Sequence, residues 1–205
     1  MSAKESLIQS LIDERFLKTP SLIEAFRAID RADFVPKELR DEAYGNYPLP
    51  IGYGQTISQP LTVAFMLELL APQSGEKMLD VGSGSGWTTA LLSYIAGAEG
   101  HVMSIEIIPE LCAWGNENVE KYNFVAKSIA EFICDNGKNI IDRQFDKILS
   151  GAASDAAIPD WWRRQCAVGG RIVAPVAGSI WLFIKKSETE WEEKEYPGFA
   201  FVPLV

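Results

Sequence analysis

The chain has 205 residues, which is enough for one domain with a sizeable hydrophobic core. Hydrophobic residues make up 47% of it and charged residues 23%, as in ordinary globular domains. The net charge of −9 argues against nucleic acid as the main partner, because phosphate binding requires a basic surface. The sequence also lacks the long apolar run of a membrane span and the pattern of a signal peptide, so we expect no membrane partner.

The cysteines and the histidine restrict the chemistry further. Cys112, Cys134 and Cys166 are widely and irregularly spaced in apolar surroundings. This spacing is typical neither of a disulfide framework nor of a zinc site, so we predict buried free thiols and a cytoplasmic location. His101 is the single histidine of the chain. A histidine general base and a histidine-rich metal site are therefore disfavoured, and we expect no metal.

In chain order, apolar residues at helical spacing predict two helices near the N-terminus, separated at Thr19-Pro20, with Ser21 and Glu24 as a capping box for the second. Residues 31–50 are rich in turn formers and predict an irregular segment, and residues 61–70 predict a helix. Between them, residues 50–60 place glycines, hydroxyls and amides between two prolines. That composition suits a loop which approaches a ligand closely through its backbone and hydroxyl groups.

From Lys77 onward the pattern alternates between strands and helices. We predict strands over residues 78–81, 102–105, 132–134 and 145–149, and helices over residues 87–96, 109–122 and 159–167. Residues 171–176 and 180–185 predict a hairpin that turns at Ala177-Gly178, and residues 199–205 predict a last strand. This alternation predicts an α/β fold with a doubly wound, mostly parallel sheet, helices on both faces and an antiparallel C-terminal hairpin.

A glycine loop follows the first of these strands. Gly82, Gly84 and Gly86 open the predicted helix, and Trp87 occupies the position that a third glycine of a dinucleotide-binding loop would need, so a pyrophosphate cofactor is disfavoured. Glu106 ends the next predicted strand, where a carboxylate can accept hydrogen bonds from both ribose hydroxyls. The alternatives are a simple tight turn and a solvated acid at a helix entry.

Two further acids accompany the loop. Asp135, in the sequence Asp135-Asn136-Gly137 after the third predicted strand, is suited either to the amine of an adenine or to an ordinary turn. Asp80 precedes the glycine loop, where an acid favours a positively charged ligand. S-adenosylmethionine carries an ammonium and a sulfonium group and no phosphate. The acidic set of Asp80, Glu106 and Asp135 therefore suits it better than NADP or ATP.

Several short sequence motifs along the chain point to one protein family when they are taken together. They are Arg-Ala-Asp-Phe-Val-Pro at residues 31–36, Leu-Pro-Ile-Gly-Tyr-Gly-Gln-Thr-Ile-Ser-Gln-Pro at residues 49–60, the glycine loop, Ile-Glu at residues 105–106, Phe-Asp-Lys-Ile at residues 145–148 and Phe-Val-Pro-Leu at residues 201–204. In this order they resemble the protein-L-isoaspartate (D-aspartate) O-methyltransferases over almost the whole chain. The resemblance implies the class I S-adenosylmethionine-dependent methyltransferase fold, which is Rossmann-like with a seven-stranded sheet. We expect a single domain, with N-terminal helices and a substrate loop in residues 1–76 and a cofactor-binding core in residues 77–205.

The resemblance also implies a repair enzyme. Such enzymes move a methyl group from S-adenosylmethionine to the α-carboxyl of L-isoaspartyl residues in aged proteins, and the ester collapses to a succinimide that hydrolyses partly to aspartate. A carboxylate is already ionised at neutral pH, so the reaction needs positioning and no general base. The expected partners are isoaspartyl proteins and peptides, and we expect a monomer.

Individual roles follow from the residues and the resemblance together. The family's active-site serine corresponds to Ser58, for which the alternative is a cap on the helix at residues 61–70. Substrate contacts are expected at Gly54, Gln55, Thr56 and Ser58. Cofactor contacts are expected at Thr56, Ile57, Ser58, Asp80, Gly82, Ser83, Gly84, Gly86, Glu106 and Asp135.

The chain also departs from the family pattern. Leu61 stands where many members have histidine or tyrosine, and residues 123–137 look altered. Two alternatives therefore stay open. One is a methyltransferase of the same fold that acts on another carboxylate, and the other is a non-catalytic relative that binds S-adenosylmethionine.

Overall fold

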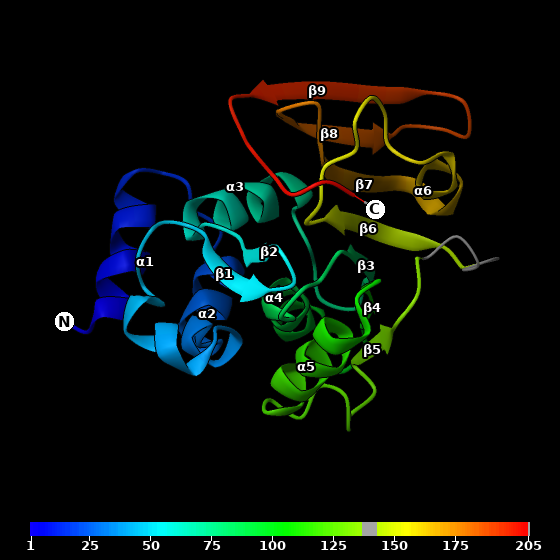
Figure 1. Cartoon of the computed structure of the whole chain (residues 1–205). Helices are drawn as coiled ribbons and strands as arrows, with labels where there is room; N and C mark the ends of the chain where they lie inside the picture. Colours follow the sequence, from blue (N-terminus) through cyan, green and yellow to red (C-terminus); the bar gives the residue numbers. More distant parts are fainter. Residues whose placement is uncertain (137–142, 205) are drawn as a thin grey trace.

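The computed structural model describes residues 1–136 and 143–204, and its centre is one seven-stranded sheet (Figure 1). The strands are β3 (Lys77–Val81), β4 (His101–Ile105), β5 (Ala130–Ile133), β6 (Phe145–Ser150), β7 (Cys166–Val176), β8 (Ser179–Lys185) and β9 (Trp191–Pro197). Their spatial order is β5-β4-β3-β6-β7-β8-β9. Pairing is parallel from β5 to β7 and antiparallel from β7 to β9. This confirms the predicted mostly parallel sheet with an antiparallel C-terminal hairpin.

Helices cover both faces of the sheet, as predicted. They are α1 (Ala3–Asp13), α2 (Pro20–Ala28), α3 (Pro60–Leu70), α4 (Trp87–Ala96), α5 (Pro109–Glu120) and α6 (Asp160–Gln165), with two 3₁₀ helices, η1 (Arg31–Phe34) and η2 (Lys37–Glu42). Met78 and Val102 belong to the hydrophobic cluster that contains α3, α4 and α5. Their strand neighbours Leu79 and Met103 point to the opposite face, where Trp162 of α6 packs. None of the helices in the described ranges is long and apolar enough to span a membrane.

The start of α2 differs from the prediction. The helix begins at Pro20, with Thr19 as its N-cap residue, and no side chain caps it. The predicted capping box at Ser21 and Glu24 is therefore wrong, because proline already occupies the first helical position. Thr19 instead donates both its backbone N–H and its hydroxyl to the carboxylate of Glu68 on α3, at 2.7 and 2.8 Å. This contact fixes the N-terminal helices to the core.

A small hairpin lies where the sequence predicted a loop that approaches a ligand, at residues 50–60. Strands β1 (Leu49–Gly52) and β2 (Gln55–Ile57) pair antiparallel, with Leu49 opposite Ile57. The turn places Gly52, Tyr53 and Gly54 at φ of +90°, +54° and +72°. Glycine adopts positive φ at little conformational cost, and it occupies two of these three positions. Tyr53, at the tip of the turn, is 59% exposed. Figure 1 shows the hairpin between the N-terminal helices and the sheet.

The last strand is displaced relative to the prediction. β9 comprises residues 191–197, and four consecutive charged residues, Glu192, Glu193, Lys194 and Glu195, are exposed on it. Charged side chains are common on edge strands, where they oppose pairing with another chain. Residues 199–204, predicted as a strand, form only a single bridge between Ala153 and Pro203, because β9 already occupies the edge of β8. Val205 lies outside the described residues.

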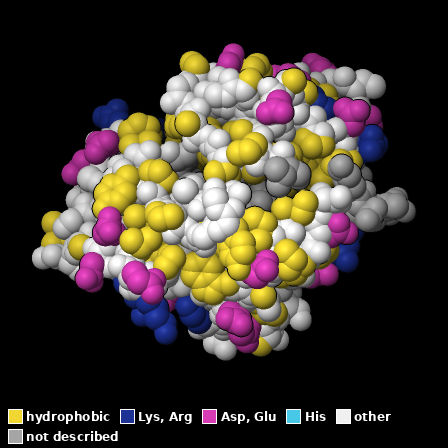
Figure 2. All heavy atoms as spheres, viewed as in Figure 1, with side chains coloured by type: hydrophobic (Ala, Val, Ile, Leu, Met, Phe, Trp, Pro, Cys, Tyr) yellow, Lys and Arg dark blue, Asp and Glu magenta, His cyan; other side chains and the backbone are white. Residues whose placement is uncertain are grey.

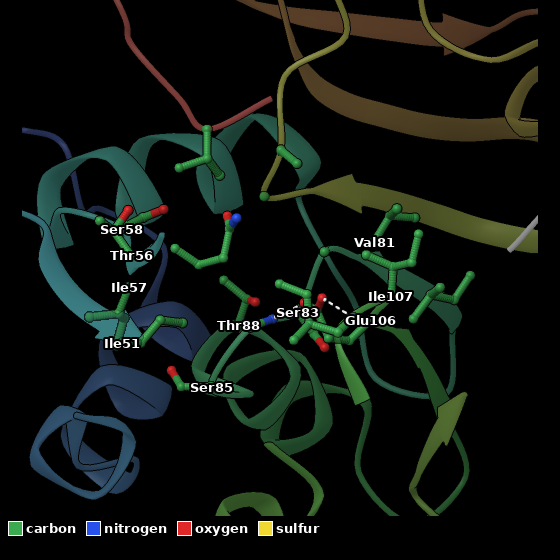
Figure 3. Close-up of a pocket in the computed structure, with 18 of the residues that line it drawn as sticks. Ile51, Thr56, Ile57, Ser58, Val81, Ser83, Ser85, Thr88, Glu106 and Ile107 are labelled. Carbon is green, nitrogen blue, oxygen red and sulfur yellow. Dashed lines mark hydrogen bonds between the residues drawn. The ribbon is translucent and has the colours of Figure 1, made fainter. Parts of the chain in front are cut away.

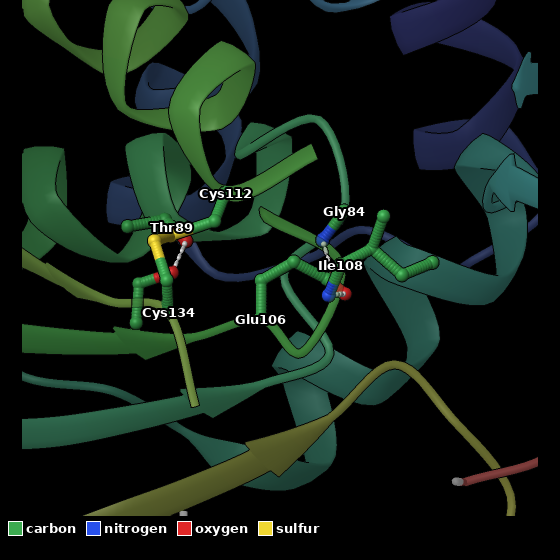
Figure 4. Close-up of a disulfide and its surroundings, with 7 residues drawn as sticks. Gly84, Thr89, Glu106, Ile108, Cys112 and Cys134 are labelled. Carbon is green, nitrogen blue, oxygen red and sulfur yellow. Dashed lines mark hydrogen bonds between the residues drawn. A yellow bond between two sulfur atoms is a disulfide. The ribbon is translucent and has the colours of Figure 1, made fainter. Parts of the chain in front are cut away.

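The cysteine prediction is wrong for two of the three residues. Cys112 in the first turn of α5 and Cys134, one residue beyond β5, form a disulfide (Figure 4). The crossover from β4 through α5 to β5 brings the two Cα atoms to 5.7 Å although 22 residues separate them, so the spacing alone gave no signal. Cys166 is free and buried, as predicted. The inference of a reducing cytoplasm rested on three free thiols and loses that support.

Candidate active site

A cavity of about 850 Å³, part of it open to solvent, lies at the carboxyl ends of β3 and β4. Its walls come from the β1–β2 hairpin and the residues after it, the glycine loop, the ends of β4 and β5, and the C-terminal segment (Figure 3). Ligands of open α/β sheets bind at this place, outside the carboxyl ends of the strands. Its lining combines backbone, hydroxyl and apolar groups, as in sites for small organic ligands.

The glycine loop forms the floor of the cavity, and its shape depends on close packing. Gly82 and Ser83 both donate their backbone N–H to the carbonyl of Ile105, at 2.9 and 3.2 Å. Gly86 has a φ of +87°, and a Cβ atom there would lie 2.8 Å from the carbonyl oxygen of Gly115 on α5. The loop can therefore press its backbone against α5, and its other side faces the cavity.

Glu106 is fixed beside this loop. Its side chain is buried, with one oxygen accepting from the backbone N–H of Gly84 at 2.9 Å and the other accepting from that of Ile108 at 3.0 Å. Each carboxylate oxygen has two lone-pair positions, so both can accept a further hydrogen bond from a ligand. This geometry suits recognition of two neighbouring hydroxyl groups.

Asp80 lies behind the glycine loop and not on the wall of the cavity. It is fully buried, and its Oδ2 accepts hydrogen bonds from the hydroxyls of Thr88 and Thr89, each at 2.7 Å. Burial raises the pKa of the Asp80 carboxyl to about 6, although the two hydroxyl donors act to lower it. Asp80 therefore ties the end of β3 to the start of α4.

The structure brings together most of the predicted site residues. The cavity is lined by Gln55, Thr56, Ile57, Ser58, Gly82, Ser83, Gly84, Glu106 and Asp135. Three predicted residues, Gly54, Asp80 and Gly86, are not part of its lining. Gly54 lies in the hairpin turn and Gly86 packs against α5. Of the predicted Asp135-Asn136-Gly137 turn, the first two residues line the cavity and Gly137 lies outside the described residues.

Ser58 and Thr56 present hydroxyl groups at the end of the cavity away from Glu106 (Figure 3). Within the described ranges neither hydroxyl makes a hydrogen bond, and α3 has Gln59 as its N-cap residue without a side-chain cap. The cap alternative for Ser58 is therefore not observed. The loop is held instead by Asn46, whose backbone carbonyl accepts from Gln59 Nε2 at 2.9 Å and whose side chain accepts from the N–H of Leu61 at 3.0 Å.

Sequence reasoning missed much of the apolar lining. It includes Ile51, Val63, Trp87, Ile107, Val202, Pro203 and Leu204. The last three reach the cavity because Val202 and Leu204 form backbone hydrogen bonds with Ala153, at 2.8 and 2.7 Å. The closing Phe-Val-Pro-Leu block was the only signal for this segment, and it does not reveal where the segment folds back.

Comparison with known proteins places this chain in a family. Residues 2–205 match the family model described as protein-L-isoaspartate (D-aspartate) O-methyltransferase. The chain belongs to this family. A protein-L-isoaspartate O-methyltransferase of Methanopyrus kandleri is 36% identical over 208 residues, which cover 99% of this chain and 91% of the relative. One of Ignicoccus hospitalis is 38% identical over 208 residues, covering 98% and 97%.

A solved structure supports the fold independently. It is a crystal structure described as a protein-L-isoaspartate O-methyltransferase of Plasmodium falciparum in complex with S-adenosyl-L-homocysteine. It matches with a TM-score of 0.89, covers 100% of this chain and 99% of its own, and is 20% identical. The predicted class I methyltransferase fold is therefore confirmed.

Proposed function

We propose that this chain transfers a methyl group from S-adenosylmethionine to the α-carboxyl of L-isoaspartyl residues in damaged proteins and peptides. Family membership supports the reaction. The observation on this chain that best supports the reaction is the cavity. The fixed carboxylate of Glu106 lies at one end, and the hydroxyls of Thr56 and Ser58 lie at the other. Such a cavity can hold a hydroxyl-bearing cofactor and a carboxylate substrate end to end.

The residues on the floor suit the cofactor. Glu106 can accept hydrogen bonds from both ribose hydroxyls, and Asp135 at the end of β5 can accept from the adenine amine. The hydroxyl of Ser83 is buried on the cavity wall without a hydrogen-bond partner in the described part of the chain, and a bound ligand would supply one. When bound, S-adenosylmethionine supplies a methyl group on a positively charged sulfur.

The hydroxyl end suits the substrate. A carboxylate is ionised at neutral pH and attacks as it stands, so the protein needs no base to activate it. Thr56 and Ser58 can each donate a hydrogen bond to one carboxylate oxygen, which leaves the other oxygen free to be alkylated. Catalysis then consists of holding that oxygen in line with the methyl group, and the apolar wall at Ile51 and Val63 excludes water from it.

The surrounding surface suits a polypeptide partner. Figure 2 shows hydrophobic side chains across the middle of the face that carries the cavity, and most charged side chains nearer its edge. We propose isoaspartyl proteins and peptides as the partners, and a monomer as the functional unit. Residues 1–76 then act as the substrate-binding segment and residues 77–205 as the cofactor-binding core of one domain.

The test uses matched peptides. Methyl transfer from labelled S-adenosylmethionine is measured with an isoaspartyl peptide and its aspartyl twin, for the wild type, Ser58→Ala and the control Ser6→Ala on α1. We expect labelling of the isoaspartyl peptide alone, reduced by about tenfold to a hundredfold in Ser58→Ala and unchanged in the control. Labelling of another carboxylate would favour the first alternative, while S-adenosylhomocysteine binding without any labelling would favour a non-catalytic relative.

A further inference from the structure

Arg31, the first residue of η1, is a buried cation beside the candidate active site. Its side chain is only 2% exposed. Within the described ranges no carboxylate lies within ion-pair distance of its guanidinium, and burial lowers its pKa to about 10. Burial of a charge without a counter-ion is costly, so the contacts that replace it should have a specific purpose.

Those contacts converge on two stretches of backbone. Nη1 of Arg31 donates to the carbonyls of Ala43 and Gly45, at 2.7 and 3.3 Å. Nη2 donates to the carbonyls of Tyr47 and Ser58, each at 3.1 Å. One planar group therefore joins the chain that enters β1 to the chain that leaves β2.

The same group also contacts a third element. The guanidinium carbon lies 5.3 Å from the centre of the ring of Trp87, the first residue of α4, in a cation–π contact. Trp87 and Ser58 both line the cavity, whereas Arg31 does not. Arg31 can therefore act on the site only through the residues that it holds.

We propose that Arg31 is a positioning residue for methyl transfer, because its guanidinium fixes the backbone of Ser58 relative to Tyr47 and to the ring of Trp87. The proposal rests on the proposed function, in which the Ser58 hydroxyl orients the substrate carboxylate. A planar fork is needed for this task. Lysine carries the same charge on a single ammonium with three donors, which cannot reproduce the four carbonyl contacts of the guanidinium.

The experiment compares Arg31→Lys with Tyr122→Phe. Tyr122 supports the same segment, since its hydroxyl donates to Asp33 at 2.9 Å and accepts from the N–H of Asp30 at 2.8 Å, but none of these contacts reaches Ser58. Tyr122→Phe is therefore a control for loss of stability alone. For Arg31→Lys we expect kcat on the isoaspartyl peptide to fall by about tenfold to a hundredfold. The Kd for S-adenosylhomocysteine should change by less than about threefold in both variants, because neither Arg31 nor Tyr122 hydrogen-bonds to Glu106 or to the three glycines of the loop.

Failure of the wild type to methylate the peptide would count against the proposed function. Hydrogen exchange tests the role of Arg31 separately, because it does not depend on turnover. The segment 43–59 should exchange faster in Arg31→Lys than in Tyr122→Phe, while α5 should exchange alike in both. Equal exchange of segment 43–59 in the two variants would overturn the positioning role. The role would also be overturned if turnover fell no further in Arg31→Lys than in Tyr122→Phe. A fall in turnover matched by an equal loss of affinity for S-adenosylhomocysteine would overturn it too.

Discussion

The carboxyl group of Asp80 makes the stability of the protein depend on pH. Burial raises its folded-state pKa to about 6 from its ordinary value of 3.8. The folded state therefore keeps a proton that the unfolded chain has already released, and the stabilisation present below about pH 4 is lost as the pH rises through about 6. Each pKa unit corresponds to about 1.4 kcal/mol, so the full effect is about 3 kcal/mol.

Asp80→Asn isolates this contribution, because an amide does not titrate. We expect the free energy of unfolding of the wild type to fall relative to that of Asp80→Asn by about 3 kcal/mol between about pH 4 and pH 7. Urea unfolding of both proteins across this range measures the difference, and the titration of groups that do not interact with Asp80 cancels in it. A difference that stays constant with pH would show that Asp80 keeps an ordinary pKa in the folded state.

At the scale of elements, the glycine loop and α5 are predicted to tolerate no side chain between them. Gly86 and Gly169 have nearly the same φ, +87° and +86°, but a Cβ on Gly86 would strike Gly115, whereas a Cβ on Gly169 would meet nothing within 4 Å. Alanine at either position costs about 1–2 kcal/mol for its left-handed conformation. We expect Gly86→Ala to lose about 1–3 kcal/mol more than Gly169→Ala in urea unfolding, because of the added overpacking. Equal losses would mean that the loop and α5 separate freely.

The disulfide makes a second prediction about elements. It joins the start of α5 to the residue that precedes Asp135 on the cavity wall. Reduction should lower the free energy of unfolding by about 2–4 kcal/mol. It should also raise the Kd for S-adenosylhomocysteine, because Asp135 loses a covalent support. Urea unfolding and calorimetric titration, each with and without a thiol reductant, measure the two effects.

The control for the disulfide is the double variant Cys112→Ser/Cys134→Ser, which keeps the buried thiol of Cys166. The reductant should leave this variant unchanged, and its stability should equal that of the reduced wild type. If the reductant destabilises the double variant as much as the wild type, the disulfide does not contribute to stability.

Elements were predictable from the sequence where periodicity and burial agree. Helix α4 was predicted with its observed bounds, since Gly86 and Gly97 flank an apolar run. The hairpin at Leu49–Ile57 was not, because its prolines and glycines read as a loop and its pairing contains an irregularity after Pro50. Strand β9 was missed for a different reason. It lies at the edge and is exposed on most positions, so its side chains show no alternation.

Part of the candidate site was predictable because its residues follow parallel strands. Gly82, Glu106 and Asp135 follow strands, and the carboxyl ends of parallel strands meet at one edge of a sheet. The burial of Asp80 behind the loop could not be predicted, because sequence position does not tell which face of a strand a residue occupies when both faces are buried. The role of the Arg31 side chain depends on carbonyl groups that the fold alone brings together.

At the scale of the whole molecule, the site is completed by the return of the C-terminal segment. Residues 202–204 line the cavity and form backbone hydrogen bonds with Ala153. Figure 1 shows the red C-terminal segment leaving β9 and running back toward the middle of the molecule. Removing residues 201–205 should leave the sheet intact, because the segment makes only one bridge to the described residues outside it. The cavity, however, would lose an apolar wall.

A second variant separates side chains from backbone in this wall. Val202→Ala/Leu204→Ala keeps the backbone hydrogen bonds to Ala153 and removes apolar surface, whereas truncation removes both. Burial of one such side chain contributes about 1.5–3 kcal/mol, so truncation should raise the Kd for S-adenosylhomocysteine by about tenfold or more. The double variant should fall between truncation and wild type in calorimetric titration, with unchanged far-ultraviolet circular dichroism in all three proteins. Unaltered affinity after truncation would show that the glycine loop and Glu106 bind the cofactor without this wall, which would then serve only the polypeptide substrate.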